Sequence, residues 1–197
     1  MDQNASFATC VNMFCPNAKV VYDLFHMVYN FGRLVISAIR IRLAEQFKQN
    51  KKDTEYKRLK NSRFMLLARK RNLTDDRLLR LNDILVNNKE LYESDILKEL
   101  LPEIWKASSK EEATVLWNRW GEMALESTAP EIKTFARNQK KRYSDGITNS
   151  GIFHMGTSVL EGKNNKIKVI KRVAFGYRDF DYFRLRVMSA FRGKQFA

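Results

Sequence analysis

The stretch Leu24-Phe-His-Met-Val-Tyr-Asn-Phe-Gly-Arg-Leu-Val-Ile-Ser-Ala-Ile-Arg-Ile-Arg-Leu-Ala-Glu-Gln-Phe47 carries an apolar side chain at every third or fourth position. These positions are Leu24, Val28, Phe31, Val35, Ile39, Leu43 and Phe47. A spacing of three or four residues places them on one face of a helix. The stretch therefore predicts one long amphipathic helix, and the helical pattern continues from it to Tyr143.

Further helices are expected on both sides of this stretch, because each has a start signal or an apolar period of its own. They are Asn4–Phe14 before Pro16, Asp75–Val86 after a Thr74 cap, residues 89–105, a helix after the capping box Ser109–Glu112, and a helix from the capping box Thr128–Glu131 to Arg142. Only eight glycines and three prolines in 197 residues agree with a mainly helical chain. Trp105, Trp117 and Trp120 are interpreted as packing anchors between helices rather than as platforms for stacking bases.

One short strand is expected in the first three quarters of the chain. Lys19-Val-Val-Tyr-Asp23 is rich in β-branched residues and follows a Pro-Asn turn signal. Asp23 would stand at the carboxyl end of this strand, where open α/β sheets bind their ligands. Residues 144–157 contain three glycines and are predicted to form a loop, with a second short strand near Ile152.

The composition favours an anionic partner. The chain has 36 Lys and Arg and a net charge of +14. From Glu161 onward there are ten basic residues against three acids, so this segment is the densest candidate surface for phosphate. No apolar run is long enough for a membrane span and no signal peptide is evident, so a cytoplasmic protein is expected. Cys10 and Cys15 are interpreted as core or neutral positions.

The segment Thr157–Arg172 places one carboxylate, Glu161, at the start of a strongly basic amphipathic stretch. Ser158 and Glu161 have the spacing of a capping box, which predicts a helix beginning here. Its expected inward residues are Leu160, Ile167 and Ile170, and its expected outward residues are Lys163, Lys166, Lys168, Lys171 and Arg172. Two interpretations of Glu161 stay open: a helix cap, or a carboxylate for metal-assisted chemistry on a phosphate backbone. The basic run likewise is either a solvated helix face or a contact for DNA phosphates.

Several motifs together resemble a known family. They are Pro16-Asn-Ala-Lys-Val-Val-Tyr-Asp-Leu-Phe-His26, Leu66-Leu-Ala-Arg-Lys70, Leu116-Trp-Asn-Arg-Trp120, Leu160-Glu-Gly-Lys-Asn-Asn-Lys-Ile-Lys-Val-Ile-Lys-Arg172 and Ala174-Phe-Gly-Tyr-Arg-Asp-Phe-Asp-Tyr-Phe-Arg184. In this order the chain is similar to the C-terminal part of DDE transposases of bacterial insertion sequences, the ISL3 family. The resemblance covers essentially the whole chain.

The resemblance implies a mainly α chain in which a ribonuclease-H-like α/β catalytic core, here incomplete, is interrupted by a large α-helical insertion. Residues 1–26 would be a remnant of the core, made of a helix and a strand. Residues 27–145 would be the insertion, and residues 146–197 the C-terminal part of the core with its basic helix. Such transposases nick and join DNA at the ends of the element, act as homo-oligomers and associate with the nucleoid.

The same resemblance assigns roles to individual residues. Asp2 and Glu161 would be catalytic carboxylates that bind Mg²⁺ or Mn²⁺, and Asp23 and His26 a supporting pair. His26 is otherwise a hydrogen-bonded core residue. The residues expected to contact DNA are Lys163, Lys166, Lys168, Lys171, Arg172 and Arg178.

The first catalytic Asp of the family has no counterpart in the sequence, so a truncated copy that does not cleave DNA alone is expected. The alternative is a non-catalytic DNA-binding or dimerising remnant that modulates a full-length transposase. A third possibility is a basic helical protein that binds a protein partner. Steep weakening of DNA binding with salt separates the first two from the third.

Overall fold

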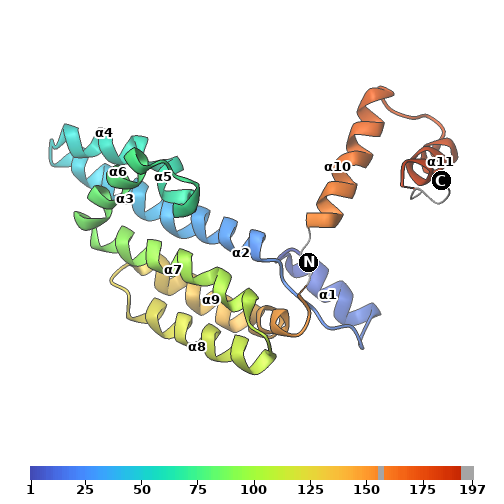
Figure 1. The fold of residues 1–197 in the computed structure, drawn as a ribbon, viewed down its shortest axis with the longest axis horizontal. Helices are drawn as coiled ribbons and strands as arrows, with labels where there is room; N and C mark the ends of the chain where they lie inside the picture. Colours follow the sequence, from blue (N-terminus) through green and yellow to red (C-terminus); the bar gives the residue numbers. More distant parts are fainter. Residues whose placement is uncertain (155–157, 192–197) are drawn as a thin grey trace. The chain divides into compact units, whose positions relative to one another are not determined.

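A computed structural model describes residues 1–154 and 158–191, which form two compact units, Met1–Met155 and Gly156–Ala197. Each unit is built from helices, as Figure 1 shows, and the residues so described contain no β-strand. The expectation of a mainly α protein is therefore confirmed. A ribonuclease-H-like core and the three-part domain division stay predictions.

The helices of the first unit follow the sequence closely. They are α1 (Ala5–Phe14), α2 (Leu24–Phe31), α3 (Ser37–Gln49), α4 (Asp53–Asn61), α5 (Arg63–Leu67), α6 (Asp75–Val86), α7 (Lys89–Lys106), α8 (Lys110–Glu126) and α9 (Pro130–Thr148). Three shorter helical turns accompany them, namely the π-helical η1 (Gly32–Ile36) and the 3-10 turns η2 (Lys70–Asn72) and η3 (Asn149–Gly151). Helices α7, α8 and α9 pack on one another (Figure 1), α7 also packs against α2, and α7 and α9 pack against η1.

The predicted long helix is present as one continuous helical path through α2, η1 and α3 (Figure 1). Phe31, Val35 and Ile39 on its apolar face are completely buried. The π turn interrupts the regular hydrogen bonding, and there the Ser37 hydroxyl donates to the Gly32 carbonyl oxygen at 2.9 Å. Such π turns inside a helix recur at functional sites.

Aromatic rings hold this helix to the bundle. The Phe31 ring meets Trp120 edge-on at a centroid distance of 6.0 Å and Phe135 at 5.3 Å. Trp117 stacks on Trp120 at 5.0 Å, and the indole N–H of Trp120 donates to the Leu97 carbonyl at 2.9 Å. Trp105 is partly buried. The tryptophans are therefore packing anchors, as the sequence predicted.

The capping predictions had different outcomes. Ser109 accepts the Glu112 N–H at 3.1 Å, and the Glu112 carboxylate accepts the Ser108 N–H at 2.7 Å, so the first box is essentially confirmed. The second box, from Thr128 to Glu131, is not formed. Thr128 donates instead to the carboxylate of Glu93, because a neighbouring helix brings a stronger acceptor within reach.

Two local predictions were wrong. Residues 19–23 are extended but form no strand, because their backbone groups find partners outside any sheet. The chain after Ser144 is not a loop from that point, because α9 continues to Thr148 and η3 follows it. Buried side chains at the end of α9 prolong the helix, and the strand expected near Ile152 is absent. Residues 155–157 of the predicted loop lie outside the described part.

Buried charges fasten the connection after α5 to α7. The Lys98 ammonium is buried and donates to the carbonyl oxygens of Leu66 and Ala68, each at 3.0 Å. Asp95 accepts from Lys98 at 2.9 Å and pairs with Lys70 at 2.6 Å. Each buried charge thus has an opposite charge beside it, as burial requires.

A second ion pair joins α3 to α7 and α9. The Arg42 guanidinium donates to both carboxylate oxygens of Glu131, at 2.7 and 3.1 Å, and to Glu90 at 2.8 Å. The hydrogen bond from Arg42 outweighs the effect of burial and lowers the pKa of Glu131. Arg42 therefore takes the acid that the predicted capping box would have used.

The second unit consists of α10 (Ser158–Val173) and α11 (Phe180–Ala190). Gly176 turns the chain after α10 with a φ of 104°, a conformation that favours glycine, and its N–H donates to the Lys171 carbonyl at 3.0 Å. Asp179 caps α11 through the N–H groups of Asp181 and Tyr182. The predicted capping by Ser158 and the inward position of Leu160 lie outside the described side chains.

No described helix is both long enough and apolar enough to cross a bilayer. Cys10 and Cys15 are exposed free thiols on and beside α1, so of the two interpretations the neutral position holds and the core position does not. None of the described side chains of α1 is fully buried.

We predict that Glu131→Gln lowers the free energy of unfolding at neutral pH by about 1 kcal/mol, a value reduced for the partial exposure of Arg42. Because the folded pKa of Glu131 lies below 4.5, its contribution is present above that pH and is lost as the pH falls through the folded value. Thermal unfolding from neutral to acidic pH should show the difference between the two proteins shrinking below pH 4.5.

Glu103→Gln is the matched control, because Glu103 is an exposed acid whose partner Lys106 is also exposed. Equal effects of the two substitutions would contradict a specific role for the Arg42 pair.

Candidate active site

An extended segment, Val20 to Asp23, builds the site in the first unit. The Tyr22 N–H donates to the Gly146 carbonyl at 3.0 Å and the Asp23 N–H donates to the Met1 carbonyl at 3.1 Å. The nitrogen of Met1 in turn donates to the Val21 carbonyl at 2.5 Å. Residues 1 and 21–23 therefore pair through their backbones, which brings Asp2 beside the start of α2.

Side chains from α7 and η3 complete this attachment. The Trp105 indole N–H donates to the Tyr22 carbonyl at 3.0 Å, and the Asn149 amide donates to the Val20 carbonyl at 2.9 Å. Tyr22 is buried against Gly146 and meets the Tyr143 ring edge-on at 5.1 Å. Burial, and then the neighbouring Tyr143, raise the pKa of Tyr22. The segment before Asp23 is thus held by the C-terminal ends of α7 and α9 and by η3.

The structure brings Asp2, Asp23 and His26 together. The Nδ1 atom of His26 lies 3.2 Å from a carboxylate oxygen of Asp23, and its Nε2 atom lies 3.8 Å from one of Asp2. The Asp23 side chain is buried, at 8% exposure, whereas 45% of the Asp2 side chain is exposed. A buried carboxylate therefore orients the imidazole, and the imidazole faces an accessible carboxylate.

A network of amides holds Gln3, the residue after Asp2. Gln3 donates to Gln139 on α9 at 2.8 Å, and Asn30 on α2 donates to Gln3 at 3.2 Å. An open polar groove is lined by Asp2, Arg33 and Arg142. Neither arginine was predicted from the sequence as a site residue. The spacing of His26, Asn30 and Arg33, which forms a polar face on an otherwise apolar helix, was a signal for them.

Glu161 lies in the first turn of α10 and is exposed, in the second unit. Lys168 and Arg172 follow it at seven and eleven residues, which places them on the same face of the helix. Lys163, Lys168, Lys171, Arg172 and Arg178 are all exposed, as predicted. Lys166 is exposed too, but its ammonium donates to the Ala190 carbonyl and lies over the Phe191 ring, so it also joins α10 to α11.

Carboxylate oxygens are the donors that Mg²⁺ and Mn²⁺ prefer, so Asp2 and Glu161 suit such an ion in type. Each unit contributes only one of these two carboxylates, and one carboxylate does not make a metal site. Among residues 1–154 and 158–191, no group of three or more His, Cys, Asp or Glu side chains is arranged to hold a metal ion. The pairing of Asp23 with His26 instead fits a supporting role.

A comparison with known families decides the classification. The family model described as a transposase, of the ISL3 type of DDE transposases, matches residues 1–187. The chain belongs to the ISL3 transposase family. Its match covers α1 to α9, α10 and most of α11, so both units fall within the family.

Individual relatives agree with this ISL3 assignment. The transposase for insertion sequence element IS1001 of Bordetella parapertussis is 36% identical over 193 residues, which are 98% of this chain and 47% of that protein. The transposase for insertion sequence element IS1557 of Mycobacterium tuberculosis is 28% identical over 124 residues, 62% of this chain and 27% of that protein. The chain thus spans about half the length of the first relative, and its match covers about a quarter of the second. No solved structure matches the chain.

We predict that Gly146→Ala disturbs the site. A Cβ atom at Gly146 would lie 2.4 Å from two carbons of the Tyr22 ring, so the segment that carries Asp23 must shift. The expected cost is about 1–3 kcal/mol in the free energy of unfolding. Changed NMR signals of the His26 ring would accompany it, because Tyr22 directly precedes Asp23.

Gly162→Ala is the matched control, since a Cβ atom there meets nothing within 4 Å. It should leave the His26 signals unchanged and, within a helix, raise stability by up to about 1 kcal/mol. An unchanged His26 spectrum and unchanged stability in Gly146→Ala would show that Tyr22 does not position Asp23.

Proposed function

We propose that this chain is part of an insertion-sequence transposase that cleaves and joins DNA at the ends of its element. The observation that carries the proposal is the family match over residues 1–187. It gains support from Asp2 and Glu161, two exposed or half-exposed carboxylates at the positions that the family resemblance assigns to metal ligands. The proposal places both residues on Mg²⁺ or Mn²⁺ in the complete transposase, with a ribonuclease-H-like core.

The divalent ions, when bound, supply the Lewis acid that activates a water or 3′-hydroxyl and stabilises the leaving oxygen. The protein has to orient the carboxylates that hold them. In the first unit this task falls to His26, which contacts Asp2 on one side and the buried Asp23 on the other. We assign Asp23 and His26 as positioning residues on this basis.

The phosphate backbone is assigned to the face of α10 that carries Glu161. Lys168 and Arg172 share this face, so phosphates held by them would lie near the carboxylate. Lys163, Lys166, Lys171 and Arg178 extend the positive surface of the same unit. We propose that this surface binds the DNA backbone independently of sequence. The chain by itself is expected to bind DNA without cutting it.

We predict that duplex DNA binding weakens steeply with salt and depends on α10. Replacing Lys168, Lys171 and Arg172 with Gln should reduce the slope of log K against log salt by about 0.9 for each lost phosphate contact. Fluorescence anisotropy of a labelled duplex, measured at several salt concentrations, tests this. The matched control replaces Lys51, Lys57 and Arg77, three exposed cations of the first unit, with Gln. An equal fall in slope for both triple variants would refute a specific role for α10.

The metal assignment can be tested without catalysis. In an isotope-labelled chain, Mn²⁺ should broaden the amide NMR signals next to Asp2 and next to Glu161. Asp2→Asn should abolish the first effect and Glu161→Gln the second, whereas Asp76→Asn on the exposed face of α6 should change neither. Broadening that survives both substitutions would reject these two residues as ligands. Mg²⁺-dependent nicking of plasmid DNA that Glu161→Gln abolishes would support the assignment but contradict the expected inactivity of the chain alone.

A further inference from the structure

Five neighbouring residues of α2 and η1 form a surface here called the α2 strip: Phe25, Tyr29 and Arg33, which are exposed, and His26 and Asn30, which are partly exposed. Phe25 and Tyr29 are four residues apart and lie on one side of the helix, and His26 and Asn30 lie on the other. Arg33 follows both pairs. The Phe25 and Tyr29 rings are 61% and 57% exposed and stack on each other at 6.3 Å, although aromatic rings gain most by burial.

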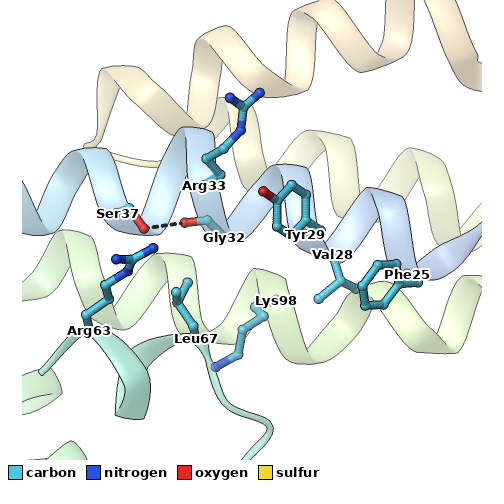
Figure 2. A pocket seen from close by; sticks show the side chains of 9 residues that line it. All are labelled: Phe25, Val28, Tyr29, Gly32, Arg33, Ser37, Arg63, Leu67 and Lys98. Carbon is cyan, nitrogen blue, oxygen red and sulfur yellow. Dashed lines mark hydrogen bonds between the residues drawn. The ribbon is translucent and has the colours of Figure 1, made fainter. Parts of the chain in front are cut away.

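An apolar pocket opens on the aromatic side of the α2 strip. Figure 2 shows the Tyr29 ring between Arg33 and Phe25, with Leu67 and Lys98 on the opposite wall. Gly32 allows this wall to approach, because a Cβ atom there would lie 2.9 Å from Leu67. The pocket has a volume of about 260 Å³, smaller than the roughly 300–1,000 Å³ typical for drug-sized ligands. A single heterocyclic ring is the size of group that suits it.

The other side of the α2 strip borders the polar groove that Asp2 also lines. Asn30, Asn138, Arg33 and Arg142 line this groove, so it offers amide and guanidinium donors. These are the side chains that most often contact the phosphates and sugars of nucleic acids. Arg33 lines the groove and the apolar pocket alike.

In the described part of the chain, Arg33 and Arg63, which line the pocket, and Arg40 have no acidic partner. Among the described residues, no carboxylate lies within 4.0 Å of the guanidinium of Arg33, Arg40 or Arg63. Burial, and then the charge of Arg63, lower the pKa of Arg40, and the buried Nε atom of Arg40 has no hydrogen-bond partner. By contrast, Asp95 neutralises Lys98 in the pocket wall. The arginines therefore leave a positive field that an anion would balance.

We propose that the α2 strip binds an unpaired stretch of a DNA strand, with one base in the apolar pocket against Tyr29 and the adjoining phosphates at Arg33 and Arg63. The strand is unpaired because a base can place its face on an aromatic ring only after it leaves the double helix. Arg33 and Asp2 line the same groove, so the bound strand can continue along it past Asp2. This inference rests on the proposed function for its substrate, and it adds a second DNA contact to that of α10.

Fluorescence anisotropy with the full chain tests the proposal, using a labelled single strand and the blunt duplex of the same sequence. Combined Phe25→Ala and Tyr29→Ala substitutions should weaken binding of the single strand by about tenfold, the loss expected for one stacked base, and change duplex binding less than about twofold. Arg33→Ala should also weaken the single strand and reduce its salt slope by about 0.7.

The matched controls are Tyr92→Ala, an exposed tyrosine on α7, and Arg77→Ala, an exposed arginine on α6. Neither should change single-strand binding. Equal losses in the control and α2 variants, or no loss in the α2 variants, would overturn the proposal. No loss in the α2 variants would instead favour a protein partner for the α2 strip.

Photo-crosslinking covers the case in which an α2 variant fails to fold. A single strand containing 5-iododeoxyuridine should crosslink the wild-type chain within Phe25–Arg33, and crosslinks confined to other peptides would overturn the proposal. Salt-dependent duplex binding through α10 can survive this failure, so the failure of the α2 strip is distinguishable from failure of the proposed function.

Discussion

The burial of one helical face against three aromatic rings is the constraint on which the first unit depends. Phe31 meets Trp120 and Phe135, and Trp117 stacks behind Trp120. Close-packed interiors tolerate little displacement, so this contact fixes the rotation of α2 about its axis. The same rotation determines that His26 faces Asp2 and that Phe25 and Tyr29 face solvent. The site and the exposed aromatic pair are thus consequences of the core.

The segment before α2 shows how a site can be positioned without a sheet. Buried backbone groups need hydrogen-bond partners, and residues 20–23 find theirs in Met1, Trp105, Gly146 and Asn149. These partners come from the chain start, α7, α9 and η3. Asp23 therefore lies in a place defined by several elements at once, which suits the positioning role that we propose for it.

The cations of the chain fall into two groups. Some cations hold the fold together, as Lys98 does with Asp95, Arg42 with Glu131 and Lys166 with the end of α11. Others, among them Lys168 and Arg172 on α10 and Arg33 and Arg63 around the α2 strip, lie where an anion can reach them. A net charge of +14 describes their sum only, whereas the DNA binding that we propose depends on the second group.

Most of the helices could be predicted from the sequence, because their apolar period and start signals are local. The long helix, the helix after Ser109 and the role of the tryptophans as anchors were predicted for this reason. The strand at residues 19–23 was predicted wrongly, since β-branched composition reports an extended backbone but not its partners. Thr128 failed as a cap because Glu93 and Arg42, distant in sequence, compete for the groups involved.

For the site, the sequence determined which residues are candidates, and the family motifs supplied Asp2, Asp23, His26 and Glu161. Only the tertiary structure decided that the first three meet and that Arg33 and Arg142 line the groove beside Asp2. Local patterns determine which face of its own helix a side chain occupies. The meeting of side chains from different segments depends on how those helices pack, and packing is set by contacts between residues far apart in the chain.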